Sequence, residues 1–74
     1  MELNDFISNF ADQFDETEGI NATTVFHELE EYNSLIALSI IAMVDEAYDV
    51  TLKGDDIRSA ITVEDLFNIV KNKQ

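Results

Sequence analysis

The chain has no cysteine, no proline and no tryptophan, and only two glycines among its 74 residues. Without cysteine there can be no disulfide framework, no thiolate metal site and no catalytic thiol. Because proline and glycine are the usual helix breakers, their scarcity favours an all-helical chain. No apolar run approaches the roughly 20 residues that a membrane helix needs, and no basic segment followed by an apolar run marks a secretory signal. We therefore expect a cytoplasmic protein without membrane insertion.

Basic residues are also scarce and unevenly placed. Four bases stand against 16 acids, which gives a formal net charge of −12. All four bases lie beyond residue 52, where four acids balance them, so the first 52 residues carry the whole excess (16 − 4 = 12 acids). Such a field repels nucleic acid and steers association with basic protein surfaces. The alternative is an acidic surface that only keeps a small protein solvated.

The sequence offers little for enzymatic chemistry. It has one histidine, His27, no glycine-rich phosphate loop and no basic cluster, so we predict no catalytic residues and no enzyme. A lone histidine is a poor metal-ligand candidate, and we expect His27 to be structural or on the surface. A twelve-residue calcium loop beginning at Asp49 fails because Thr51 and Lys53 occupy ligand positions three and five, and Ala60 stands where a bidentate Glu is required. We therefore predict no metal site.

Apolar spacing predicts four helices joined by one long loop. Apolar residues spaced three and four apart indicate a helix over 3–14, and an aperiodic stretch over 15–33 indicates a loop held to the core by Ile20, Val25, Phe26 and Leu29. A second helix is predicted over 35–48. Asp55 or Asp56 can cap a short helix, and Thr62 with Asp65 can form the capping box of a last one. The chain is thus predicted to be one domain, residues 1–74, with an all-α fold: a small four-helix bundle with one short helix.

The second predicted helix has two unequal faces. A broad arc is apolar and predicts burial over most of the circumference; it contains Ile36, Ala37, Ile40, Ile41, Met43, Val44, Ala47 and Tyr48. The other arc begins at Ser34 and carries Leu35, Leu38 and Ala42, flanked by acids. These leucines are either incidental surface residues or the apolar centre of a docking surface with an acidic rim.

Ser34 stands where this helix begins, after the acidic loop. The simplest interpretation of a serine there is a helix N-cap. The same position also favours an anion such as phosphate, because free backbone N–H groups and the helix dipole converge on it.

One pattern spans nearly the whole chain: Asn33-Ser34-Leu35, an apolar helix ending in Asp45-Glu46-Ala47-Tyr48, then Val50 and Leu52, then Thr62-Val63-Glu64-Asp65-Leu66. This pattern resembles the acyl carrier protein family, whose members are short acidic four-helix bundles. In that family the serine of an Asp-Ser-Leu motif receives 4′-phosphopantetheine from coenzyme A. The resemblance places that cofactor on Ser34, beside Asn33 and Leu35.

The resemblance also implies partners. Ser34 would be modified by a phosphopantetheinyl transferase, and the thiol of the arm would carry acyl groups as thioesters to enzymes of fatty-acid, lipid or secondary-metabolite synthesis. Partner-binding residues would be Leu35, Leu38 and Ala42, with Asp45, Glu46, Glu30 and Glu31 steering basic docking surfaces. Nothing in the sequence demands more than a monomer.

Departures from the family pattern keep other interpretations open. Asn33 replaces the usual aspartate, and Ile36 stands where an acid is common, which indicates a specialised carrier. The alternatives are an aminoacyl or peptidyl carrier, and an unmodified acidic helical adaptor that uses the same face to bind proteins.

Overall fold

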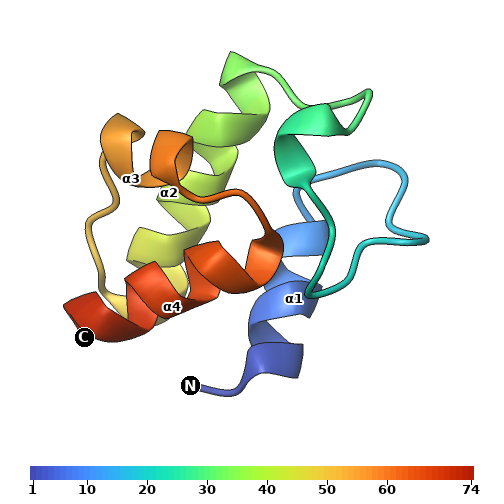
Figure 1. Ribbon diagram of the computed structural model, residues 1–74. Coiled ribbons are helices and arrows are strands. Elements are labelled where there is room, and N and C mark those ends of the chain that lie inside the picture. The colour runs from blue at the N-terminus through green and yellow to red at the C-terminus, as the bar shows by residue number, and fades with distance from the viewer.

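Four α-helices form the fold in the computed structural model, which describes residues 1–74 (Figure 1). They are α1 (Leu3–Ala11), α2 (Ser34–Tyr48), α3 (Gly54–Ser59) and α4 (Val63–Lys73), and a single-turn 3-10 helix, η1 (Phe26–Glu28), lies in the long loop. α1 packs against both α2 and α4, and α3 packs against α4. The predicted all-α class and helix order are confirmed. None of these helices is both long and apolar enough to span a membrane.

Aromatic rings from three segments fill the centre of the core. Phe6 and Phe10 of α1 are fully buried, as is Phe26 of η1. The Phe6 ring meets Phe67 of α4 edge-on at 5.7 Å between centroids, and Phe10 meets Phe26 in the same way at 5.4 Å. Such edge-to-face pairs add about 0.5–1.5 kcal/mol to the stability gained from burial alone. No polar or charged side chain is buried, so hydrophobic packing holds the bundle together.

α1 is shorter than its apolar spacing predicts. It ends at Ala11 rather than at residue 14, and the next turn is closed by hydrogen bonds from Gln13 N–H to the Phe10 carbonyl and from Phe14 N–H to the Ala11 carbonyl. Phe14 remains buried in this tighter turn. The predicted end of α1 was wrong because an apolar spacing of three or four residues fits both an α-helix and a tighter turn. In both cases the second residue lies on the same face as the first.

The long loop is ordered by contacts at both of its ends. Both carboxylate oxygens of Glu31 accept backbone N–H groups, from Asp15 at 2.9 Å and Glu16 at 3.0 Å. Farther along, Val25 forms an isolated antiparallel bridge with Thr62 at the start of α4. The sequence predicted a loop held by apolar residues, and Phe26 is indeed buried, but it predicted neither η1 nor this bridge.

The apolar arc of α2 faces the core as its sequence predicts, with one exception. Ile40 and Val44 are fully buried, and the partly buried residues of the arc that pack against the core are Ile36, Ala37, Ile41, Met43 and Tyr48. Ala47 is exposed. The predicted side of the helix is therefore confirmed, but burial over most of the circumference was too broad, because residues at the edges of the arc are only partly covered.

The last two helices begin with carboxylate contacts. Thr62 Oγ1 accepts the Asp65 N–H at 3.1 Å while Asp65 Oδ2 accepts the Thr62 N–H at 3.0 Å, which confirms the predicted capping box. α3 starts earlier than expected, at Gly54, so the residue in the capping position is Lys53 and not Asp55 or Asp56. Asp56 instead accepts the Lys53 N–H at 2.9 Å from within the first turn.

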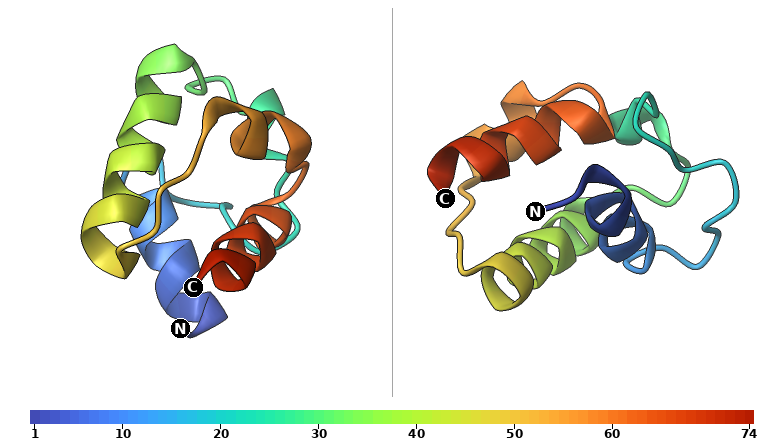
Figure 2. Two further views of the ribbon diagram at one scale, coloured as in Figure 1. Left: turned by 90° about the vertical axis from the view of Figure 1, so that its left-hand side faces the viewer. Right: turned by 90° about the horizontal axis from the view of Figure 1, so that it is seen from below.

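Both chain termini lie at the end of the molecule opposite the start of α2, as the views in Figures 1 and 2 show. The start of α2 is surrounded instead by η1 and α3.

Candidate functional site

The start of α2 separates the capping residue from the predicted functional residue. Asn33 has extended backbone angles, and its Oδ1 accepts the Ile36 N–H at 2.9 Å. Its carbonyl accepts the first intrahelical hydrogen bond, from Ala37 N–H, at 2.9 Å. Asn33 is therefore the N-cap, and Ser34 is the first residue of the helix. The simplest expectation from sequence, that Ser34 itself caps the helix and that the helix begins at Leu35, was wrong.

The Ser34 side chain is exposed and takes part in no hydrogen bond within the protein. Because Asn33 satisfies the Ile36 N–H, the amides of Ser34 and Leu35 remain the free donors of the first turn. The first turn of α2 contains no acid, whereas those of α1, α3 and α4 each contain at least one. The positive end of the α2 dipole is thus not neutralised by a carboxylate of its own helix. The hydroxyl is free to react, and its surroundings favour an anionic product.

A cavity of about 350 Å³ opens beside Ser34, between α2, η1 and α3. Its wall is mixed, with apolar and polar residues both contributing. The lining residues are His27, Tyr32, Asn33, Ser34, Ala37, Ile41, Gly54, Ile57 and Arg58. Burial raises the pKa of the Tyr32 hydroxyl above its ordinary value, and this group is a neutral hydrogen-bond donor at physiological pH.

Comparison with known proteins gives the family. Over 59 residues the chain is 30% identical to an acyl carrier protein from Kocuria rhizophila, a stretch that covers 80% of this chain and 73% of that protein. The chain belongs to the acyl carrier protein family. Acyl carrier proteins carry acyl groups for other proteins and are not enzymes, so the chain is a carrier. No protein-family model matches the chain, and no solved structure matches it significantly.

His27 has a structural position in this acyl carrier fold. Its Nε2 lies 3.0 Å from the Ile57 carbonyl oxygen and 3.1 Å from that of Ala60, so Nε2 must carry the hydrogen. The ring stacks on Phe26 at 4.3 Å between centroids. His27 thereby links η1 to the end of α3. This position agrees with the expectation that His27 is structural or on the surface. Nowhere in the chain do three His, Asp or Glu side chains come together as a potential metal site.

The predicted partner-binding residues of α2 share one exposed face. Leu35 is 73% exposed and Leu38 is 61% exposed, and both are unusually open for leucine. Ala42, Asp45 and Glu46 are exposed at helical spacings from them. We call this set, Leu35, Leu38, Ala42, Asp45 and Glu46, the α2 face.

A second hollow adjoins the α2 face but does not reach Ser34. It has a volume of about 510 Å³ and is lined by Ala42 and Glu46 together with Gln13 from beyond α1. The other two predicted partner residues, Glu30 and Glu31, differ in exposure. Glu30 is exposed, whereas Glu31 is half-buried and its carboxylate already holds the loop.

Of the residues that line the cavity beside Ser34, sequence reasoning placed only Asn33 and Ser34 at the site, and the polar or cationic residues and the glycine that it missed include Tyr32, Gly54 and Arg58. Tyr32 lies two residues before Ser34, and its proximity was a usable signal. Gly54 and Arg58 come from α3, and only the packing of α3 on the bundle brings them near α2. No local pattern in the sequence indicates that contact.

Proposed function

We propose that Ser34 carries a covalent 4′-phosphopantetheine arm and that the chain holds acyl groups on this arm as thioesters. The observation that carries the proposal is the exposed Ser34 hydroxyl at the start of α2, which has no hydrogen-bond partner while Asn33 caps the helix. Membership of the acyl carrier protein family supports it. The arm supplies the thiol that the cysteine-free chain lacks.

Attachment requires the Ser34 oxygen to act as a nucleophile on a separate phosphopantetheinyl transferase. The oxygen attacks the pyrophosphate of coenzyme A at the phosphorus that bears the pantetheine, and the adenosine bisphosphate leaves. One O–P bond forms, one P–O bond breaks, and the hydroxyl proton passes to the transferase. The product is a phosphodiester, whose negative charge lies next to the free amides of Ser34 and Leu35.

The α2 face is the proposed docking surface for acyl-handling enzymes. Leu35 and Leu38 would give it an apolar centre, while Asp45, Glu46 and Glu30 would attract basic surfaces on the transferase and on later partners. Such an interface suits rapid and reversible exchange between enzymes. We propose that residues 1–74 form one carrier domain that acts as a cytoplasmic monomer in fatty-acid, lipid or secondary-metabolite synthesis.

Loading with an acylated cofactor tests this function. A broad-specificity transferase offered acetyl-coenzyme A should attach an acylated arm to the wild-type chain, and neutral hydroxylamine should then release the acetyl group because it is a thioester. Ser34→Ala should acquire nothing, whereas Ser39→Ala, which alters another exposed serine of α2, should load like the wild type. Loading that survives Ser34→Ala would contradict the proposal.

The exposed leucines also suit an unmodified adaptor, and one comparison separates the two functions. An adaptor should lose partner affinity on Leu38→Ala and keep it on Ser34→Ala, because it needs only the α2 face. A carrier should lose all acyl transfer on Ser34→Ala even though its fold remains intact.

A further inference from the structure

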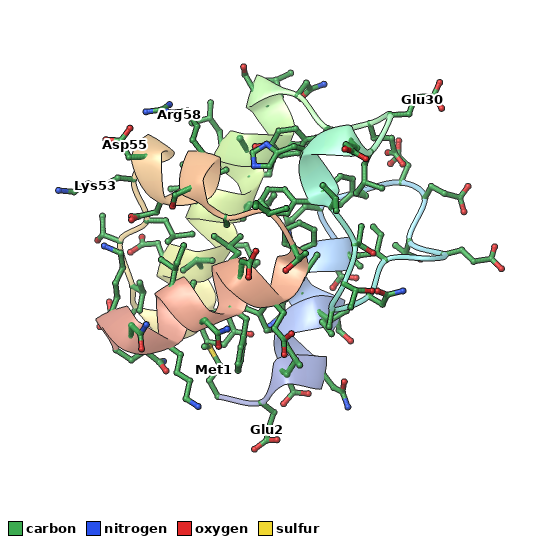
Figure 3. All side chains as sticks on the ribbon, in the orientation of Figure 1. Met1, Glu2, Glu30, Lys53, Asp55 and Arg58 are labelled. Carbon is green, nitrogen blue, oxygen red and sulfur yellow. The ribbon has the colours of Figure 1, made fainter.

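Arg58 is the only cationic side chain that lines the cavity beside Ser34. The other three bases line none of the hollows on the surface, and Lys73 is already paired with Asp56 at 3.3 Å. In a chain with a net charge of −12, one guanidinium beside the predicted modification site is unexpected. Figure 3 shows Arg58 and Asp55 extending from α3 at the end of the molecule where α2 begins.

The Arg58 guanidinium lies against Gly54. A Cβ at residue 54 would lie 3.1 Å from Nη1 of Arg58, a tight contact, so the guanidinium folds back over the first turn of α3. Arg58 also pairs with Asp55 through one nitrogen. Both side chains of this pair are highly exposed, at 71% and 88%, so the pair contributes little stability.

The guanidinium therefore retains donors for a second anion. Arginine carries five N–H donors in a planar fork, and the contact to Asp55 uses only one of its nitrogens. A fork of this kind binds phosphate oxygens in pairs, with hydrogen bonds stronger than those between neutral groups.

We infer that Arg58 binds the phosphodiester of the arm on Ser34 and that the first part of the arm lies in the cavity between α2 and α3. This inference rests on the proposed function and adds to it a binding residue for the cofactor. Ser34 and Arg58 line the same cavity, and the phosphodiester is bonded directly to the Ser34 oxygen, so the anion and the cation border the same space. The other charges of the protein are overwhelmingly acidic and repel the same phosphodiester.

The rest of the cavity fits the segment of the arm that follows the phosphodiester. A volume of about 350 Å³ lies within the range of small-molecule sites, roughly 300–1,000 Å³. Ala37, Ile41 and Ile57 offer apolar surface to the two methyl groups of the pantoyl unit. The Tyr32 hydroxyl has no hydrogen-bond partner within the protein and can meet the hydroxyl or amide of the arm. A carboxylate on the cargo is a less suitable partner for Arg58 because it sits at the far end of the arm.

Nuclear magnetic resonance of the modified protein without cargo tests this inference. In the wild type, attachment of the arm should shift the Nε–Hε resonance of Arg58, and the phosphorus resonance should differ from that of the same phosphodiester in the modified protein unfolded in urea. In Arg58→Gln the phosphorus resonance of the folded protein should move toward the value of the unfolded chain. Lys53→Gln, which removes an exposed base outside the cavity, should leave the phosphorus resonance of the modified protein unchanged.

The outcomes distinguish this inference from the proposed function. The mass of each sample is measured first, and a chain that gains no arm would overturn both proposals. A chain that gains the arm but shows the same Arg58 resonance before and after attachment would overturn only the role of Arg58. An Arg58 resonance that shifts only when the arm bears a cargo with a carboxylate would also overturn the role of Arg58. Because Arg58 is exposed, Arg58→Gln should fold, and circular dichroism confirms this before the comparison is made.

Discussion

Asn33 caps α2 through its side-chain oxygen, which accepts the Ile36 N–H at 2.9 Å, and so leaves the neighbouring Ser34 hydroxyl without a structural partner. Asn33 caps the helix, and Ser34 has no part in the cap. An asparagine serves for this purpose as well as an aspartate, because a cap needs one acceptor oxygen and no charge. The departure of Asn33 from the family pattern therefore leaves the local geometry of the serine intact.

Stability measurements can separate the two roles. Asn33→Ala should lower the free energy of unfolding by about 1 kcal/mol because the Ile36 N–H loses its acceptor. Ser34→Ala should change it by less than about 0.5 kcal/mol, since no hydrogen bond is lost. Urea unfolding of the two variants beside the wild type provides the test. Equal losses in both variants would show that Ser34 contributes to the cap.

A matched pair of leucines tests the packing of the bundle. Leu66 is fully buried and Leu38 is 61% exposed. Leu66→Ala should cost about 2–5 kcal/mol because it leaves a cavity in the core, whereas Leu38→Ala should cost less than about 0.5 kcal/mol. Both values come from urea unfolding. A large loss at Leu38 would mean that the α2 face is structural and not a surface for partners.

Helix order and some helix boundaries could be predicted because they depend on local patterns. Thr62 and Asp65 sit three residues apart before an apolar stripe, and the structure forms the capping box that this spacing predicts. The burial of Phe6, Phe10, Phe26 and Phe67 follows from their hydrophobicity. The family pattern also points to Ser34, whose role as the attachment site stays a prediction.

What could not be predicted depends on contacts between distant segments. Arg58 and Ser34 line one cavity because α3 packs on α4 and lies beside α2. Glu31 holds the loop by reaching back to Asp15, which no local rule indicates.

Asp65 should make the fold sensitive to acid. Hydrogen bonds from the backbone N–H groups of Thr62 and Ile61 lower the pKa of its carboxyl below the ordinary value. The folded state then holds this proton less tightly than the unfolded state does. The resulting stabilisation is present above the unfolded pKa of about 3.9, and it is lost as the pH falls through the lower folded value.

Asp65→Asn isolates this effect, because it removes the titrating charge and keeps an acceptor oxygen. The wild type should be more stable than the variant near neutral pH, and the difference should shrink below about pH 4. Comparison with the variant is needed because loss of the general negative charge acts on both proteins in the same acid range. A difference that stays constant down to low pH would contradict the role of the Asp65 carboxylate.

The fold should become more stable as salt is added. The first 52 residues carry all twelve excess acids, and the structure contains only two ion pairs, so repulsion between surface charges dominates. Salt screens this repulsion within about 10 Å at 0.1 M ionic strength. The melting temperature should therefore rise between low and moderate ionic strength. A flat or falling melting temperature would refute this electrostatic explanation.

The most direct test of Ser34 as the attachment site is the intact mass of the protein after incubation with coenzyme A and a broad-specificity phosphopantetheinyl transferase. The wild type and Ser39→Ala should each gain the mass of one phosphopantetheinyl group, and Ser34→Ala should gain none. No gain by the wild type with several transferases, or a gain that persists in Ser34→Ala, would contradict the assignment of Ser34 as the carrier residue.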